Sequence, residues 1–235
     1  MGGATIVDPA TTEADAMAGP TVTEDYLKAI FNASEWSEGP VTVTALSQRL
    51  ALAPSSVSEV VKKLTQRGLI THERYGSIAL TADGERIALA TVRKHRLIET
   101  FLVDYLGYGW HEVHDEAEVL EHAVSDTFVE RLAEKLGQPT HDPHGDPIPS
   151  AKGHLPMEEL TALPEVQAGA QVRIARVWDD DPDLLRHLRT VGLDIGAVLT
   201  VVARHPAAGT VELSLSGAPV SLGLPAAGAI LTAPA

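Results

Sequence analysis

The sequence predicts an α+β protein whose helical N-terminal and central regions precede a C-terminal region of short strands. Apolar residues recur every three or four positions through much of residues 21–136, which is the spacing of one helix face. Residues 69–80 interrupt this pattern, because apolar and polar residues alternate there as in paired strands. Beyond residue 165, five short Val- and Leu-rich runs are separated by Gly, Pro and Asp, which is typical of a small β-barrel of SH3-like type.

The composition excludes several classes of protein. Hydrophobic residues make up 44% of the 235 residues, and no apolar run approaches the length of a membrane span. The absence of cysteine excludes disulfides and thiolate metal ligands. Residues 1–20 are acidic and lack the basic start of a secretory signal, so we expect a disordered leader and a cytoplasmic protein. The net charge of −14 alone argues against nucleic acid, but residues 41–74 are net positive.

The first two helices are expected at residues 21–37 and 41–50. Thr23 is the predicted N-cap of the first, which ends before a Gly-Pro pair. Thr44 is the predicted cap of the second. A third helix follows over residues 55–67 after a tight turn.

In that third helix, Ser56 and Glu59 have the spacing of a capping box, and Gly68 ends the helix. Two short helices across a tight turn indicate a helix-turn-helix, although an ordinary helical hairpin shows the same pattern. The strand-like residues 69–80 would add the wing of a winged helix over residues 21–82. In such a fold the second helix of the motif, here residues 55–67, enters the major groove of DNA. The wing tip reaches a phosphate or the minor groove. The candidate DNA contacts are Ser55, Ser56, Ser58, Glu59, Lys62, Lys63 and Arg74.

A long helix is expected at residues 81–106, capped by Thr81. His95 and Glu99 are four residues apart on it and therefore share a face. They are either a pair of metal ligands or a surface His–Glu hydrogen bond.

The next helix is expected over residues 113–136. Glu118, Glu121 and His122 point the same way on it, one turn after His114. Carboxylates with an imidazole suit manganese or iron(II), although an exposed acidic helix would have the same composition. An apolar stripe along this helix is wide enough for a subunit interface; it consists of Val119, Leu120, Val124, Phe128, Leu132 and Leu136.

Residues 137–164 are rich in Pro, Gly and His and are interpreted as a loop or linker. We assign no metal-binding role to its histidines, His141, His144 and His154, because no helix or strand fixes their geometry. The strand-rich region at 165–235 contains one helical insert, PDLLRHLRTVGL.

Several separated motifs resemble, in the same order, those of the diphtheria-toxin-repressor family, and specifically its manganese-sensing branch. They are TEDYL at 23–27, the APSSVSEVVKKL segment, RKHRLIETFL at 93–102, VHDEAEVLEHAVSD at 113–126 and GDPIP at 145–149. The resemblance implies a winged helix at 21–82, a helical metal-binding and dimerisation domain at 83–149, a linker at 150–164 and a FeoA-like, SH3-like domain at 165–235. It further implies a non-enzymatic transcriptional repressor that binds palindromic operators as a metal-loaded homodimer and controls metal-uptake genes.

The resemblance also implies two metal sites. The regulatory site maps onto Asp25, Glu118, Glu121 and His122, whereas iron-sensing members have Met and Cys at the first two of these positions. The ion implied is therefore Mn²⁺, with Fe²⁺, Co²⁺ or Zn²⁺ as substitutes. Lys28 occupies the position of a second carboxylate found in some manganese sensors, which argues against a binuclear site of that kind. The ancillary site maps onto His95, Glu99 and His114, with Asp180 and Asp183 as the nearest match to oxygen ligands from the barrel, although a plain acidic turn would look the same.

Two alternative functions are compatible with parts of the sequence. A winged-helix regulator of an organic ligand would leave the spaced His and Glu residues unexplained. A metallohydrolase could use the same cluster to activate water, but HEVH at 111–114 is not the HExxH pattern of zinc proteases.

Overall fold

The computed structural model describes residues 19–36, 39–73, 76–156 and 158–235, which fall into two compact units. The first unit ends at Val92 and the second begins at Arg93. In the described residues no helix is both long and apolar enough to cross a bilayer. Residues 1–18, which include most of the predicted leader, lie outside the described part of the chain.

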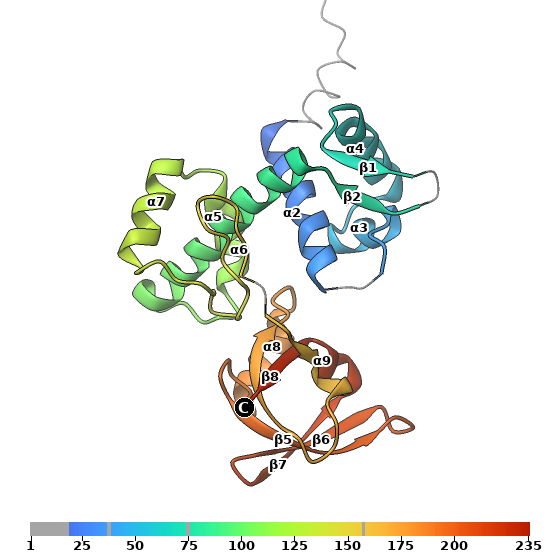
Figure 1. Cartoon of the computed structure of the whole chain (residues 1–235), viewed down its shortest axis with the longest axis vertical. Coiled ribbons are helices and arrows are strands. Elements are labelled where there is room, and N and C mark those ends of the chain that lie inside the picture. The colour runs from blue at the N-terminus through green and yellow to red at the C-terminus, as the bar shows by residue number, and fades with distance from the viewer. Residues whose placement is uncertain (1–18, 37–38, 74–75, 157) are drawn as a thin grey trace, which may run out of the picture. The chain divides into compact units, whose positions relative to one another are not determined.

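The first unit is a winged helix (Figure 1). Its hairpin is antiparallel, with Ile70 opposite Leu80 and His72 opposite Ile78. The Ile78 amide also donates to the Val41 carbonyl (2.8 Å), which attaches the hairpin to the start of the second helix. The elements are α2 (Pro20–Trp36), α3 (Val43–Arg49), α4 (Pro54–Gln66), β1 (Ile70–His72), β2 (Ile78–Leu80) and the first part of α5 (Ala82–Leu106).

The predicted helix caps in this unit are partly wrong. Thr23 lies inside α2, which starts at Pro20, and its buried hydroxyl accepts a hydrogen bond from Arg67 (2.7 Å). Thr42 rather than Thr44 caps α3, because its hydroxyl accepts from the Ala45 amide (3.1 Å).

The third helix also starts differently from the prediction. No side chain caps α4, so the Ser56–Glu59 capping box is not formed. Pro54 occupies its first turn, where the fixed φ of proline favours helix and its missing N–H costs nothing. Thr81 does cap α5, accepting from the Gly84 amide (3.2 Å).

The second unit begins with the remaining turns of α5, against which two shorter helices pack: α6 (Val113–Glu121) and α7 (Asp126–Lys135). The single helix predicted over residues 113–136 is therefore wrong. Ser125 caps α7 by accepting from the Phe128 amide (3.2 Å), and this local hydrogen bond competes with a continuous helix. The predicted apolar stripe is divided accordingly: Leu132 is buried, whereas Val119 and Phe128 are exposed.

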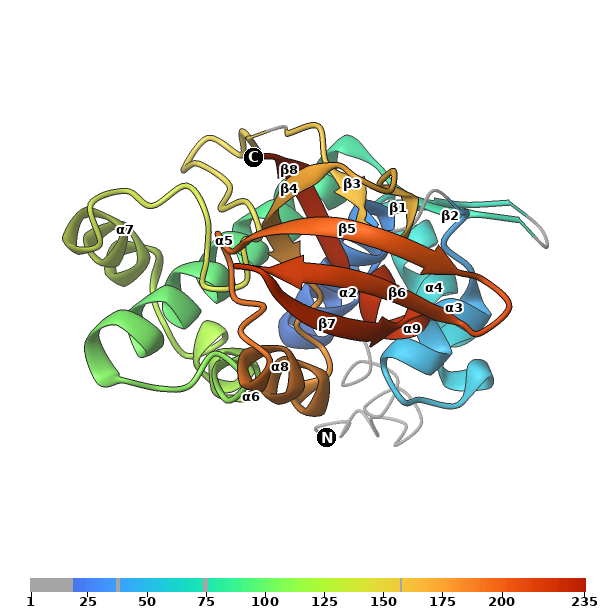
Figure 2. The same ribbon diagram turned by 90° about the horizontal axis from the view of Figure 1, so that it is seen from below.

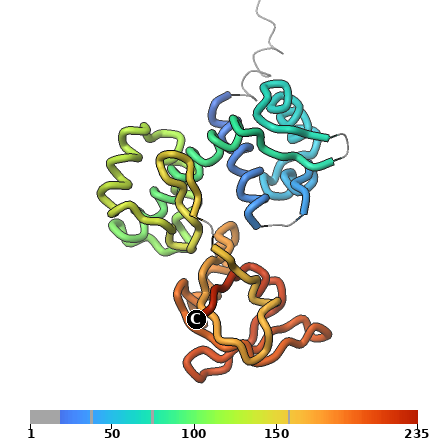
Figure 3. Tube along the Cα trace, viewed as in Figure 1, coloured from blue at the N-terminus to red at the C-terminus, as the bar shows by residue number. Residues whose placement is uncertain are grey.

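The C-terminal part of the second unit is a strongly curved antiparallel sheet whose trace closes into a ring (Figure 3). The strand order is β3-β8-β4-β5-β6-β7, and β5, β6 and β7 lie side by side in Figure 2. All five predicted strands and the helical insert are present. The elements are β3 (Thr161–Ala162), η1 (Leu163–Glu165), β4 (Gln171–Val177), α8 (Pro182–Thr190), β5 (Val198–His205), β6 (Thr210–Leu215), β7 (Ala218–Gly223), α9 (Leu224–Gly228) and β8 (Ile230–Pro234).

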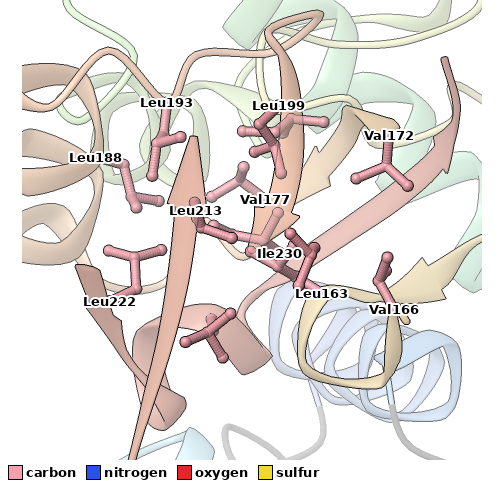
Figure 4. Close-up of a cluster of buried hydrophobic side chains, with 14 of the residues drawn as sticks. Leu163, Val166, Val172, Val177, Leu188, Leu193, Leu199, Leu213, Leu222 and Ile230 are labelled. Carbon is pink, nitrogen blue, oxygen red and sulfur yellow. The ribbon is translucent and has the colours of Figure 1, made fainter. Parts of the chain in front are cut away.

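Aliphatic side chains fill the interior of this sheet (Figure 4). Leu163, Val177 and Ile230 are each fully buried in it. Trp110, from the segment between α5 and α6, belongs to the same cluster, so the helical domain contributes one aromatic ring to the core of the barrel. The barrel and the helical domain thus share part of a hydrophobic core.

We predict that Gly84→Ala destabilises the winged helix. A Cβ at Gly84 would lie 1.9 Å from the carbonyl oxygen of Leu69, which is backbone and cannot rotate away. We expect a loss of about 1–3 kcal/mol in the free energy of unfolding, measured with urea. Gly228→Ala is the control, since a Cβ there meets nothing within 4 Å. Equal stability of the two variants would contradict this close approach.

Candidate metal centre

The centre is built around two consecutive turns of α5. His95 and Glu99 are both buried, and Nε2 of His95 lies 3.0 Å from Oε1 of Glu99. Nδ1 of the same ring lies 2.6 Å from Oε2 of Glu121 on α6. The predicted pairing of His95 and Glu99 is thus part of a larger buried cluster that joins two helices.

His114, at the start of α6, extends this cluster. Its Nδ1 lies 3.6 Å from Oε1 of Glu99, and its Nε2 lies 3.7 Å from Oε1 of Glu118. The His95 and His114 rings meet edge to face with centroids 4.9 Å apart. The three residues predicted for the ancillary site, His95, Glu99 and His114, therefore lie together.

The barrel contributes Asp179 to the same cluster. Oδ2 of Asp179 lies 3.4 Å from Nδ1 of His114. The residues predicted from the sequence were Asp180 and Asp183 instead. Both are exposed, Asp183 pairs with Arg186, and neither belongs to a group of candidate ligands in the described part of the chain. Asp179 lies two residues after the end of β4, and the run of three aspartates at 179–181 gave no signal that distinguished it from its neighbours.

His144 is a further candidate ligand, to which the sequence analysis gave no role. It is fully buried, and its Nε2 lies 2.6 Å from the Trp110 carbonyl oxygen. Because a carbonyl can only accept, Nε2 carries a proton, and in the neutral ring Nδ1 is then free to bind a metal. That Nδ1 lies 3.8 Å from Oε2 of Glu99 and 4.0 Å from Oδ2 of Asp179.

Asp142, two residues earlier in the same loop, joins this group. One of its carboxylate oxygens accepts from the backbone amides of His144 (2.8 Å) and Asp146 (2.9 Å). Glu99, Asp142 and His144 offer ligand atoms that lie within 4.8 Å of one another. A turn that buries two ionisable side chains beside Glu99 is therefore part of the centre and not only a linker.

The donor set fits a divalent cation. Four buried carboxylate or imidazole atoms of this cluster make no hydrogen bond in the described structure: Oε2 of Glu99, Nδ1 of His114, Oδ2 of Asp142 and Nδ1 of His144. Leaving such atoms unpaired is costly unless a ligand binds them. Carboxylate oxygens and imidazole nitrogens are the donors that manganese, iron(II) and zinc accept.

Protons supply positive charge to this cluster when no metal is bound. Burial by itself would lower the pKa of His114, but the carboxylates of Asp179 and Glu99 raise it to about 11. Burial would likewise raise the pKa of Glu99, but the imidazoles, His95 foremost, hold it well below its usual range. Burial, with the charge of Glu99, raises the pKa of Asp142 to about 7. A metal ion entering the cluster must therefore displace protons.

The residues predicted for the regulatory site lie in both units. Glu121 is buried at the end of α6, with Oε1 lying 3.4 Å from Nε2 of His122. Oε1 of Glu118 lies 4.0 Å from Nδ1 of His95. His95, a residue of the predicted ancillary site, therefore also contacts residues of the predicted regulatory site. Asp25 is half-buried on α2 in the first unit, so a site that combines it with Glu118, Glu121 and His122 remains a prediction.

The candidate DNA contacts lie on α4. Val57, Val60, Val61 and Leu64 bury one face of this helix. Ser55, Ser58 and Lys62 are exposed on the opposite face, and Glu59 pairs with Lys63 (3.1 Å). Ser56 and Lys63 are half-buried. Arg74 lies outside the described residues.

Three family models match the chain in succession. They are the N-terminal DNA-binding domain of the iron-dependent repressors at residues 20–78, their metal-binding and dimerisation domain at 81–150, and the FeoA domain at 161–234. The chain belongs to the diphtheria toxin repressor family. It is a metal-dependent transcriptional repressor and not an enzyme, which excludes the organic-ligand and hydrolase alternatives.

Curated relatives and solved structures agree with this family. The iron-dependent repressor IdeR of Mycobacterium leprae is 33% identical over 191 residues, covering 76% of this chain and 83% of that protein. The diphtheria toxin repressor of Corynebacterium diphtheriae is 29% identical over 212 residues, covering 85% and 91%. A manganese-dependent transcriptional repressor in complex with manganese is 46% identical with a TM-score of 0.87, covering 91% of this chain and 100% of that one. The repressor ScaR with bound Cd²⁺ is 36% identical with a TM-score of 0.80, covering 91% and 99%. The similar proteins thus include both iron-dependent and manganese-dependent repressors.

We predict that Asp179→Asn lowers the pKa of His114 in the metal-free protein. Among the groups that raise this pKa to about 11, Asp179 contributes most, so its loss should move the pKa towards 6.5, the ordinary value of histidine. The charged imidazole stabilises the fold below the unfolded pKa of about 6.5, and this contribution is lost as pH rises towards the folded value. NMR titration of the histidine ring protons in the presence of a chelator measures the shift. An unchanged pKa would contradict the contact between Asp179 and His114.

Proposed function

We propose that the chain is a Mn²⁺-activated repressor that binds palindromic operators as a homodimer in the cytoplasm and controls metal-uptake genes. The observation that carries the choice of Mn²⁺ is the donor set, which consists of carboxylates and imidazoles and contains no sulfur. Iron(II), Co²⁺ and Zn²⁺ are expected to bind the same donors, since affinity for such sites rises from manganese to copper.

Two sites are proposed. The regulatory site consists of Asp25, Glu118, Glu121 and His122. The second site takes His95, Glu99 and His114 from the helices and, in place of Asp180 and Asp183, Asp179 from the barrel. His144 is proposed as a further ligand, because its Nδ1 lies near Glu99 and makes no hydrogen bond in the described structure.

Repulsion between carboxylates is the proposed source of the switch. Asp25 belongs to the unit that carries the helix-turn-helix, whereas Glu118 and Glu121 belong to the unit that carries the dimerisation domain. A bound divalent cation supplies the positive charge that cancels the repulsion among these three carboxylates. With repulsion removed, Asp25 holds α2 to α6, and the helix-turn-helix takes a fixed position relative to its copy in the dimer.

The spacing of the two α4 helices then decides DNA affinity. Two recognition helices read a palindrome only when they lie about one helical turn of DNA, or a multiple of it, apart. Ion binding therefore selects the DNA-competent arrangement, and DNA in turn raises ion affinity by the same factor. Lys62, Lys63 and Arg74 are proposed to contact phosphates, and Ser55, Ser56, Ser58 and Glu59 lie on the helix that enters the groove.

The test is binding to a promoter fragment of a manganese transporter with and without Mn²⁺. We expect tighter binding with the ion, by a factor within about 5–150 for coupled sites, and a steep decrease in affinity with salt. Parallel titrations with Fe²⁺ under anaerobic conditions decide which ion activates at the lower concentration. Equal affinity with and without Mn²⁺ would remove the corepressor role of the ion.

The variant Glu121→Ala tests the regulatory site. Glu121 is a buried carboxylate in contact with His95, so its loss removes a proposed ligand and should abolish activation by Mn²⁺. Circular dichroism should show an unchanged helix content. Glu134→Ala, an exposed glutamate on α7, is the matched control and should respond fully. If Glu121→Ala responds like the control, the assignment of this site is wrong.

A further inference from the structure

A buried carboxylate lies where the loop of residues 141–149 meets strand β4 of the barrel. Asp146 is 4% exposed, and both of its cationic neighbours are buried as well. The guanidinium of Arg176, on β4, donates through Nε to Oδ1 of Asp146. Nη2 of Arg96, on α5, lies 3.5 Å from Oδ2 of Asp146. One carboxylate thus faces cations from the helical domain and from the barrel.

The backbone of the same loop lies directly on β4. The Val177 amide donates to the His144 carbonyl (2.9 Å). Gly145 has a φ of +84°, and a Cβ there would lie 1.9 Å from the Ala175 carbonyl oxygen. The pairing of β4 with β8 shifts register between Ile174 and Arg176, as in a β-bulge. Because a bulge re-aims the side chain that follows it, this irregularity accounts for the direction of Arg176.

The α5 side of the junction is equally well fixed. Nη1 of Arg96 donates to the Pro147 carbonyl (2.6 Å), and Nη1 of Arg93 donates to the Pro149 carbonyl (2.8 Å). The loop is therefore held by two arginines on consecutive turns of the helix that also carries His95 and Glu99.

Candidate metal ligands lie on both sides of this junction. His144 precedes Asp146 by two residues, and Asp179 follows Arg176 by three. Arg96 precedes Glu99 by three residues on α5. Displacement of β4 from the loop would therefore withdraw Asp179 from His114, whereas the buried ion pairs keep the three segments in register.

We infer that Asp146 is a positioning residue, which joins Arg96 to Arg176 and thereby holds the barrel where Asp179 and His144 reach Glu99 and His114. Docking of the barrel and loading of the second site are then linked: each favours the other by the same factor. The linkage to loading rests on the second site proposed above, whereas the docking itself does not.

The burial of Asp146, Arg96 and Arg176 is consistent with a role in fixing the position of the barrel on the helical domain. A buried ion pair adds little net stability, because desolvation offsets attraction, but it disfavours arrangements in which one charge is left unpaired. Arg96 contacts both Asp146 and Asp142 (3.8 Å), whereas Arg176 reaches Asp146 from the barrel, so displacement of the barrel would separate the buried charges of Arg176 and Asp146. An apolar contact would hold the same surfaces together with less discrimination between positions.

The experiment compares Asp146→Asn and Arg176→Gln with the wild-type full-length chain. Asp146→Asn keeps an acceptor oxygen but removes the charge, and Arg176→Gln leaves Asp146 paired with Arg96. Glu130→Gln is the matched control. Glu130 pairs with Arg93 (3.3 Å), which lies one turn before Arg96 on α5, but Glu130 is half-exposed and touches no barrel residue in the described contacts. Hydrogen exchange of β4 and of residues 141–149 is measured in the metal-free protein, and Mn²⁺ titration calorimetry gives the affinity of each site.

We expect faster exchange in β4 and in the loop for both variants, with α7 unchanged. Mn²⁺ affinity at the second site should fall by about 10–100-fold, the range found when residues that support metal ligands are removed. Mn²⁺ affinity at the regulatory site should stay within about twofold of the wild-type value. In addition, Mn²⁺ should slow exchange of β4 in the wild type more than in either variant.

Exchange and second-site affinity equal to those of Glu130→Gln in both variants would overturn the inference. Loss of cooperative unfolding of the whole second unit in both variants would also overturn it, because Asp146 would then be needed for folding and not for register. If the wild type binds a single Mn²⁺ per chain, the proposed second site fails, while exchange in the metal-free variants still decides whether Asp146 docks the barrel.

Discussion

The arrangement of the second unit depends on the burial of one carboxylate, Glu99. A charge out of contact with water is tolerated only when other charges compensate it. Here the compensation comes from imidazoles on three separate segments: His95 on the same helix, His114 on α6 and His144 in the loop. Each of these contacts brings a further part of the chain to α5, so the burial of Glu99 and the assembly of the unit are inseparable.

The same compensation explains how a protein can be both folded and responsive to an ion. Protons on the imidazoles provide positive charge in the metal-free state, as the raised pKa of His114 indicates. A divalent cation would supply the same positive charge at a single position, through directional bonds to the carboxylates and imidazoles. We therefore expect the fold to be retained without the ion, because protonated imidazoles still compensate the charge of Glu99.

Periodicity along the sequence predicted most of the fold because it records burial on one face of an element. The winged helix, the five strands and the helical insert all follow from such patterns. The helix caps at Thr23 and Thr44 and the continuous helix at 113–136 were wrong. The first helix begins at Pro20, and the hydroxyls of Thr42 and Ser125 make local hydrogen bonds that the apolar pattern does not report. A break between two amphipathic helices leaves the period almost intact when both bury the same side.

Helical spacing predicted only the part of the candidate site that shares one helix, His95 and Glu99 on α5. His114, on α6, was joined to them by the family resemblance. His144 was not predicted, since its burial depends on contacts with Trp110 and Glu99, which are 34 and 45 positions away in the sequence. The aspartate supplied by the barrel was misplaced by one position because three consecutive aspartates give no signal of their own, and only the direction of β4 distinguishes them.

The composition of the donor set has a consequence for the conditions under which the repressor operates. Sulfur ligands are oxidised by peroxide, and a metal sensor built on cysteine loses its ion when its thiolate is converted to a sulfenic or sulfinic acid. This chain has no cysteine, and the candidate ligands in the described residues are carboxylates and imidazoles. Its candidate ligand set thus contains no oxidisable sulfur. Oxidation of thiols in the cell would therefore not remove a ligand from the proposed metal sites.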